Sequence, residues 1–165
     1  MDDKSFFLRP LQAADSVRML EWLHDRTVTG FLQLNGAGFT MDDVLRFIQE
    51  AQREDTNLHR AVVDVNDTYL GTISLKNIDA DMREAEYAIA MHPAAMGTGA
   101  ALAATQEILK TAFGTLGLQR VYLNVLEENR RAVKFYGKCG FRYTHQSELV
   151  LRGERRTLLW YEKRV

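Results

Sequence analysis

Apolar positions recur along the chain with two different periods, and these periods predict an alternation of strands and helices. Spacings of three and four residues predict helices over 14–25, 40–51, 98–116 and 129–139. Alternating or continuous apolar runs predict strands over 5–11, 59–65, 69–75, 84–92, 121–126, 141–150 and 156–163. The resulting order, β-α-α-β-β-β-α-β-α-β-β, indicates an α/β protein of the α+β kind, with a mixed sheet and helices packed on it.

Local signals refine this order. Thr40 followed by Asp43 predicts a capping box at the start of the second helix. The glycine-containing segment 27–38 predicts a loop or a broken helix, and the run 121–126 is apolar on both sides, so we expect its strand to be buried on both faces. Because 165 residues fit one domain, we expect a single domain over residues 1–165.

The most informative junction lies between the strand 84–92 and the helix after it. The predicted strand ends at His92, the glycine turn Gly97-Thr98-Gly99 follows, and an alanine-rich helix begins there. N–H groups at a helix start have no intrahelical partner, and the aligned peptide dipoles make that end positive. Glycine lets the backbone adopt positive φ and lets a ligand approach closely. The junction therefore predicts a binding site for a phosphate group.

Composition and charge exclude several classes of protein. The formal net charge of −1 gives no sign of a nucleic-acid binder or a polybasic membrane anchor. The single cysteine, Cys139, excludes an internal disulfide, and no apolar run is long enough to span a bilayer. The four histidines lack the paired spacing of a metal site, so we expect no metal. With no secretion signal visible, we expect a cytoplasmic protein without nucleic-acid or membrane partners.

Three short motifs follow one another in the second half of the chain. They read AAMGTG at 94–99, VYLNV at 121–125 with NRRA at 129–132, and FYGKCGF at 135–141. Together they resemble the GNAT superfamily of acetyl-CoA-dependent N-acetyltransferases, and the resemblance covers nearly the whole chain. It implies a mixed, mostly antiparallel sheet of six to seven strands, with a V-shaped splay between the two central strands and about four flanking helices.

The resemblance also implies acetyl-CoA as co-substrate and suggests residues that bind it. The pantetheine arm is expected to pair with the backbone at the end of strand 84–92, and the diphosphate to bind the N–H groups of the glycine turn. Asn129 is expected to bind the pantetheine arm or to cap its own helix, and the two roles can coexist. The expected cofactor-binding residues are Ala90, Met91, His92, Met96, Gly97, Thr98, Gly99, Ala100, Ala101, Asn124, Asn129 and Arg131.

One departure from the family concerns charge beside the glycine turn. The family usually has Arg or Gln at position 94 and often Lys or Arg at 95 and 96, whereas this chain has Ala, Ala and Met. The backbone cradle needs no side-chain charge and is retained. Because Arg130, Arg131 and Lys134 begin the next helix, we hypothesise that they supply part of the missing attraction for CoA.

Two residues are candidates for catalysis. Tyr136 matches the family's general acid, since a phenol with a pKa of about 10 is protonated at pH 7 and can donate to a leaving thiolate. The alternative is that Tyr136 only fills an apolar helix stripe with Phe135 and Cys139. Glu86 is the candidate base for the attacking amine, and the alternative is a solvent-facing carboxylate. A backbone N–H near Met91 is expected to polarise the thioester carbonyl.

The resemblance implies an enzyme that transfers an acetyl group from acetyl-CoA to a primary amine by direct attack in a ternary complex. A non-catalytic CoA-binding module of the same fold is the alternative. A dinucleotide-binding enzyme is disfavoured, because Leu102 stands where its third glycine belongs. The run 71–79 is similar to two branches of the family, which acetylate ribosomal-protein N-termini or nucleotide-linked amino sugars. Expected partners are therefore a small-molecule amine, polyamines included, or a protein N-terminus, and a second copy in a homodimer.

Overall fold

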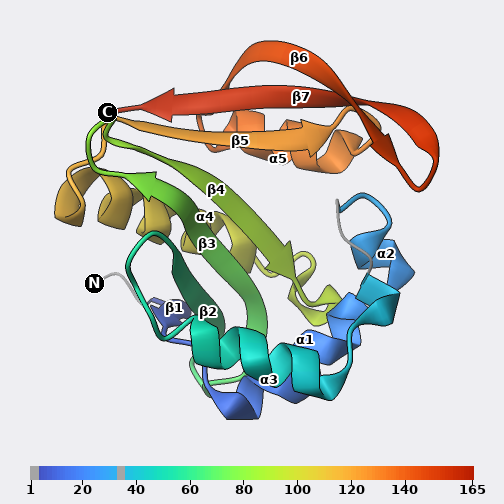
Figure 1. Ribbon diagram of the computed structural model, residues 1–165. Coiled ribbons are helices and arrows are strands. Elements are labelled where there is room, and N and C mark those ends of the chain that lie inside the picture. The colour runs from blue at the N-terminus through green and yellow to red at the C-terminus, as the bar shows by residue number, and fades with distance from the viewer. Residues whose placement is uncertain (1–3, 33–35) are drawn as a thin grey trace.

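The fold is a seven-stranded sheet in the order β1-β2-β3-β4-β5-β7-β6 (Figure 1). The computed structural model describes residues 4–32 and 36–165. Only the central pair, β4 and β5, is parallel, and every other neighbouring pair is antiparallel. The strands are β1 (Phe6–Arg9), β2 (Leu58–Asp64), β3 (Tyr69–Asp79), β4 (Glu84–Met91), β5 (Arg120–Leu126), β6 (Arg142–Leu151) and β7 (Glu154–Arg164).

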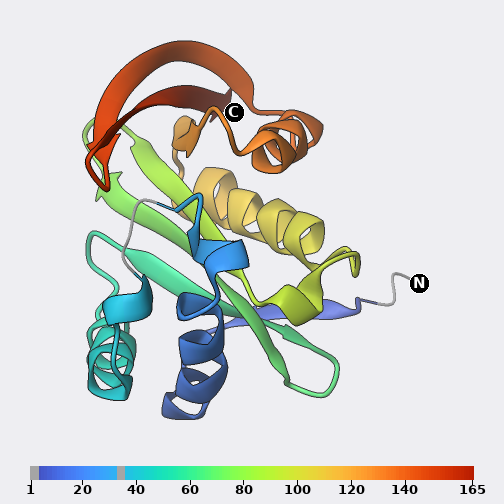
Figure 2. The same cartoon turned by 90° about the vertical axis from the view of Figure 1, so that its right-hand side faces the viewer.

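Helices cover both faces of this sheet, and each face has its own apolar core. The helices are α1 (Ser16–Leu23), α2 (Arg26–Thr29), α3 (Met41–Glu50), α4 (Ala100–Lys110) and α5 (Arg130–Lys138). Helices α1 and α3 lie on one face, over the half of the sheet formed by β1 to β4, while α4 and α5 lie on the other (Figures 1 and 2). The mixed, mostly antiparallel sheet with flanking helices that the sequence predicts is confirmed.

Several local predictions are confirmed and others need correction. Thr40 and Asp43 form the predicted capping box of α3. The segment 27–38 contributes the short α2 and a 3-10 turn at Gly36–Gly38, and its residues 33–35 lie outside the described residues. Strand β3 continues past Leu75 to Asp79, where the sequence predicted a linker, because it pairs with β4 as far as Glu84 through an irregular register.

The prediction of burial on both faces of β5 is wrong for two of its residues. Val121, Leu123 and Val125 are buried against the α4 and α5 side, whereas Tyr122 and Asn124 are only partly buried. Their side chains alternate to the face that carries α1 and α3, and these helices cover only β1 to β4 there. Asn124 thus remains open to a cavity described below.

The predicted splay between the two central strands is confirmed. Strands β4 and β5 pair only over Glu84↔Arg120, Ala85↔Val121 and Glu86↔Tyr122. Beyond Glu86 the strands continue to Met91 and to Leu126 without pairing to each other. The two strands therefore make no ladder with each other in this opening, which lies near the start of α4, where the glycine turn is.

Within the described residues, no helix combines the length and the apolar character that crossing a membrane requires.

Candidate active site

The glycine turn connects β4 to α4 through two residues in the left-handed region. After a 3-10 turn at Pro93–Ala95, Gly97 has φ of 75° and Gly99 has φ of 83°. A Cβ atom added at either glycine would meet no other atom within 4 Å, so the backbone conformation rather than crowding favours glycine there. Gly99 is the N-cap of α4, which points the start of that helix at the turn.

The turn uses some of its own polar groups and leaves others available. The Thr98 hydroxyl donates to Ala95 O at 2.5 Å and accepts from the Ala100 N–H at 3.2 Å. The Met96 N–H and the Thr98 N–H also donate within the turn. Among the described residues, no partner accepts the N–H groups of Gly97, Gly99 and Ala101. These three donors at a helix start suit a diphosphate group.

His92 supports the glycine turn. Its Nδ1 accepts from the Ala94 N–H at 3.0 Å, so the ring proton lies on Nε2, which donates to Glu21 Oε2 at 2.7 Å. The His92 backbone N–H donates to Leu70 O in β3. The imidazole therefore fixes the turn against α1.

Hydrogen-bond alternation along β4 decides which backbone groups face the splay. Because His92 pairs with Leu70, the N–H and C=O groups of Ala90 also face β3, while those of Ile89 and Met91 face the opening. Of the predicted pantetheine-pairing residues, Met91 thus has backbone groups directed into the splay. The backbone groups of Ala90 face β3, and His92 donates its N–H to Leu70 O and accepts the Ala95 N–H at its C=O.

Of the basic residues Arg130, Arg131 and Lys134 in the first half of helix α5, one lies at the glycine turn. Asn129 accepts from the Ala132 N–H at 3.3 Å, so it caps this helix as one of its two predicted roles requires. Arg131 lies with Nη1 3.1 Å from Met96 Sδ. Arg130 and Lys134 instead line a separate hollow with Glu127 and Glu128.

A cavity of about 350 Å³ joins the splay to the space under α1 and α3. We call it the central cavity. The two predicted catalytic residues, Tyr136 and Glu86, both line it, as does Asn124. Its remaining lining residues are Met19, Trp22, Leu23, Leu32, Phe39, Val44, Phe47, His59, Thr72, Ser74, Lys76, Tyr87, Ala88, Ile89 and Ala90.

Tyr136 is held by aromatic rings. Its ring meets those of Tyr87 and Phe141 at centroid distances of 5.8 Å and 6.1 Å. Burial raises the pKa of Tyr136 well above its ordinary value, so the phenol stays protonated. Within the described chain its hydroxyl makes no hydrogen bond, which leaves the O–H available to a ligand in the cavity. Packing and a donor role are thus compatible.

Glu86 is part of an ion pair. Its Oε2 lies 3.0 Å from Nζ of Lys76, which stands opposite it across β3 and β4. Lys76 was not predicted as a site residue, because the predicted strand ended at Leu75 and the register of β3 with β4 was not extended beyond it. The side chain of Glu86 is 19% exposed, which places it in the cavity wall and excludes a fully solvent-facing carboxylate.

Other expectations concern the cavity wall, Cys139 and metals. The sequence also offers Trp22, Phe31, Leu32 and Leu34 as an apolar wall for the acceptor pocket. Trp22 and Leu32 line the cavity, whereas Phe31 is 44% exposed and Leu34 lies outside the described residues. Cys139 is buried in the core. In residues 4–32 and 36–165, no three His, Cys, Asp or Glu side chains are grouped to bind a metal ion.

Comparison with known proteins identifies the family. Residues 5–142 match the family described as Acetyltransferase (GNAT) domain. The chain belongs to this GNAT family. The family assignment agrees with the splay, the glycine turn and the cavity containing Tyr136.

Two curated relatives in the GNAT family share part of their sequence with this chain. A spermidine N(1)-acetyltransferase of Vibrio cholerae is 33% identical over 100 residues, which is 60% of this chain and 58% of that protein. The Escherichia coli (strain K12) enzyme of the same name is 31% identical over 58% of this chain and 54% of its own length. The matched region thus spans little more than half the length of these relatives.

Solved structures confirm the GNAT fold over almost the full chain. Vibrio cholerae spermidine N-acetyltransferase in complex with CoA and spermine has a TM-score of 0.88 and 22% identity, covering 97% of this chain and 95% of that one. A protein described as a probable acetyltransferase has a TM-score of 0.87 and 21% identity, covering 98% and 94%. Both curated relatives and the structure with CoA and spermine are named for spermidine, so the predicted likeness to the ribosomal-protein or amino-sugar branches is not supported.

Proposed function

We propose that this protein transfers an acetyl group from acetyl-CoA to a primary amine of a small molecule. The proposal depends on one observation: the glycine turn with its available N–H donors, the splay between β4 and β5, and the cavity lined by Tyr136 lie next to one another. Membership of the GNAT family supports the same reaction. The solved relative that contains CoA is consistent with the co-substrate.

The chain has groups suited to the diphosphate, the pantetheine arm and the thioester of acetyl-CoA. The N–H groups of Gly97, Gly99 and Ala101 suit the diphosphate, because they are unpaired and lie at the positive end of α4. Arg131 adds a positive charge beside the turn. The backbone of Met91 faces the splay, where it can pair with the amide groups of the pantetheine arm and bring the thioester toward Tyr136.

The reaction then has three parts: attack of the amine, cleavage of the C–S bond with protonation of the sulfur, and loss of a proton from the nitrogen. The amine nitrogen attacks the thioester carbonyl carbon, and a backbone N–H of the splay stabilises the resulting oxyanion. As the C–S bond breaks, the Tyr136 O–H donates to the departing sulfur. The nitrogen loses one proton when the amide forms, and Glu86 is the proposed route for it. The continuity of the splay with the central cavity supports direct attack in a ternary complex, since it gives space for acceptor and thioester together.

Glu86 matters most for an acceptor that arrives as an ammonium ion. At pH 7, an amine with a pKa of about 10.4 is neutral in roughly one molecule in 2,500. Because the names of the curated relatives refer to spermidine, a polyamine of this kind is the acceptor that the comparisons suggest for the first assay.

The test measures binding and turnover separately. The first measurement is the thermal shift of the full chain with acetyl-CoA. The second is the release of free thiol from acetyl-CoA with spermidine, with simple alkylamines and without an acceptor. Amine-dependent thiol release that is lost in Tyr136→Phe supports the transferase. A thermal shift without turnover on any amine would favour the non-catalytic CoA-binding module. The absence of both the thermal shift and thiol release would refute the transferase and the binding module alike.

A further inference from the structure

The central cavity extends from the splay to the far side of β3. In the sheet register, Ala88 of β4 stands opposite Ser74 of β3, and Ser74 stands opposite His59 of β2. All three residues line the cavity. Because neighbouring strands lie about 4.8 Å apart, this row spans about 10 Å. An acceptor whose amine reaches the splay therefore lays its other end toward His59.

The wall along that path is apolar and aromatic. Helices α1 and α3 and the segment before α3 turn apolar side chains to the cavity, with Trp22, Phe39 and Phe47 as the largest. The Phe47 ring meets the His59 ring edge-on at a centroid distance of 4.9 Å. Aromatic and aliphatic walls stabilise an apolar ligand body by removing its surface from water.

The charged groups of the cavity already neutralise each other. Among its described lining residues, only Lys76 and Glu86 carry a formal charge at pH 7, and they form one ion pair. His59 adds no charge there, because burial lowers its pKa below the ordinary value, as do Lys76 and Arg60 nearby. Residues 33–35 are Gln, Leu and Asn, which are uncharged in the sequence.

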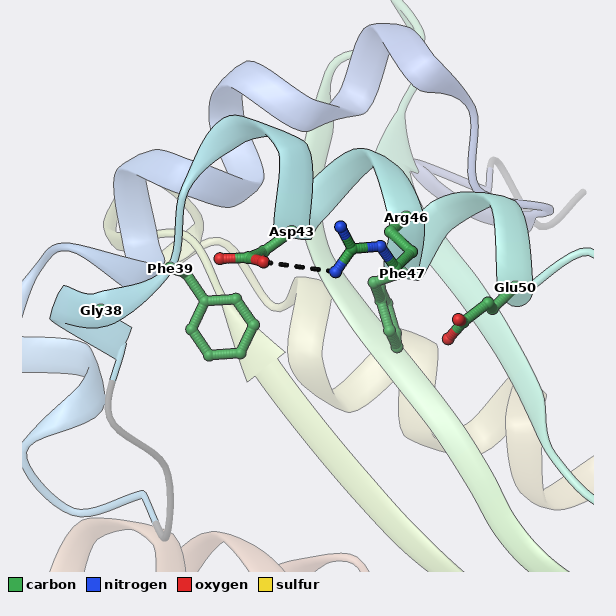
Figure 3. A pocket seen from close by; sticks show the side chains of 6 residues that line it. All are labelled: Gly38, Phe39, Asp43, Arg46, Phe47 and Glu50. Carbon is green, nitrogen blue, oxygen red and sulfur yellow. Dashed lines mark ion pairs between the residues drawn. The ribbon is translucent and has the colours of Figure 1, made fainter.

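Two acidic residues, Asp43 and Glu50, line a neighbouring surface hollow and not the central cavity. Phe39 and Phe47 also border a surface hollow of about 470 Å³, which is lined by Gly38, Asp43, Arg46 and Glu50 (Figure 3). Asp43 pairs there with Arg46 at 3.6 Å. Asp43 and Glu50 do not line the central cavity, so the part of an acceptor inside that cavity meets no carboxylate beyond Glu86.

A second ammonium group inside this cavity is therefore disfavoured. In a diamine or polyamine, the second ammonium would lie a few methylene groups from the reacting amine, near Lys76 and the aromatic wall. There it would lose part of its water, and the nearby carboxylate of Glu86 is already paired with Lys76. A single amine on an apolar chain or ring carries no such penalty.

We propose that the acceptor is a monoamine with an apolar or aromatic body, and that the Lys76–Glu86 ion pair selects against a second ammonium group. This inference rests on the proposed acetyl transfer and narrows its acceptor class. Lys76 acts here as a specificity residue, because it already pairs with Glu86, the carboxylate that a second ammonium could use among the described lining residues.

The experiment compares two amines of the same length that differ only in the second ammonium group, hexylamine and 1,6-diaminohexane. Thiol release from acetyl-CoA gives kcat/KM for each. For the unaltered protein we expect kcat/KM for hexylamine to be at least tenfold higher than for 1,6-diaminohexane. We also expect kcat/KM for 2-phenylethylamine to be higher than for spermidine. Because the ratio of the two kcat/KM values is taken within one protein, a general loss of activity in a variant does not change it.

Two variants test the role of Lys76. Lys76→Met frees Glu86 to pair with a second ammonium. In this variant we expect the ratio of kcat/KM for hexylamine to kcat/KM for 1,6-diaminohexane to fall at least threefold. Lys110→Met removes an exposed charge at the end of α4 and should leave the ratio unchanged.

The outcomes separate this inference from the proposed function. If 1,6-diaminohexane or spermidine gives a higher kcat/KM than the monoamines, the inference is overturned and acetyl transfer remains supported. A hexylamine preference that Lys76→Met does not change overturns the role of the ion pair. If no amine supports thiol release, the proposed function itself fails.

Discussion

Arg131 of α5 reaches the glycine turn, where its Nη1 atom lies 3.1 Å from Sδ of Met96. The turn carries Ala94, Ala95 and Met96, so no side-chain charge comes from this part of the loop. The helix after β5 thus brings one guanidinium group to a site that otherwise has only backbone donors. This geometry separates Arg131 from its neighbours Arg130 and Lys134, which line another hollow.

Replacing Arg131 should weaken acetyl-CoA binding. For Arg131→Ala we expect the Kd for acetyl-CoA to rise about fivefold, since a charge-assisted contact to a partly exposed phosphate contributes about 1 kcal/mol. Isothermal titration calorimetry at two salt concentrations measures this, and the salt dependence should also decrease. Arg130→Ala is the matched control and should bind as the unaltered protein does. Equal weakening by both variants would show that the contact to the turn is not the cause.

Removing the Tyr136 hydroxyl should impair the chemical step without unfolding the chain. For Tyr136→Phe we expect kcat to fall about 100-fold and KM for acetyl-CoA to change less than twofold, because the O–H acts on the departing sulfur. The midpoint of thermal unfolding should stay the same, since this hydroxyl has no hydrogen bond among the described residues. Tyr143→Phe on the exposed strand β6 is the control. An unchanged kcat would leave Tyr136 with a packing role alone.

A side chain at Gly99 should strain the backbone at the start of α4. Its φ of 83° is in the left-handed region, so Gly99→Ala should lower the free energy of unfolding by about 1–2 kcal/mol. We also expect weaker binding of acetyl-CoA, because relief of the strain would turn the N–H groups of the turn. Gly114→Ala is the control: its Cβ meets no atom within 4 Å, and its φ is not positive. Equal stability of the two variants, measured by urea unfolding, would contradict this account.

Stability should depend on pH through His59. Burial lowers its pKa in the folded state, with Lys76 and Arg60 acting in the same direction. The unfolded chain therefore binds a proton near pH 6.5 that the folded chain does not bind, and stability is lost as the pH falls from about 6.5 toward the folded pKa. The variant His59→Gln should lose less stability than the unaltered protein between pH 7.5 and 5.5. Parallel curves of unfolding free energy against pH would contradict the assignment to His59.

The sequence located the glycine turn because its signals are local. Positive φ at Gly97 and Gly99 and the start of α4 depend on residues within one turn of each other. The same is true of the Thr40 capping box and of the N-cap at Asn129. Periodicity likewise gave the order of strands and helices, since burying one face of an element imposes a fixed spacing on its own residues.

The pairing of Glu86 with Lys76 could not be predicted in this way. It depends on how far β3 continues after Leu75 and on which residue of β4 stands opposite, and a shift of one residue would turn Lys76 to the other face. The separation of Arg131 from Arg130 similarly depends on how α5 sits against the glycine turn. These are relationships between elements far apart in the chain, which no local pattern records.

The sequence by itself predicted the order of the elements and the glycine turn, because these follow from short-range geometry. It named Tyr136 and Glu86 as catalytic candidates only through the resemblance to the GNAT superfamily. Only the tertiary structure decided that β4 and β5 part after Glu86, and that Tyr136, Glu86 and Asn124 share one cavity with an aromatic wall. The physical reason is that a cavity is bounded by side chains from many elements. Its shape and charge are therefore set by packing, which the spacing of residues along one element does not specify.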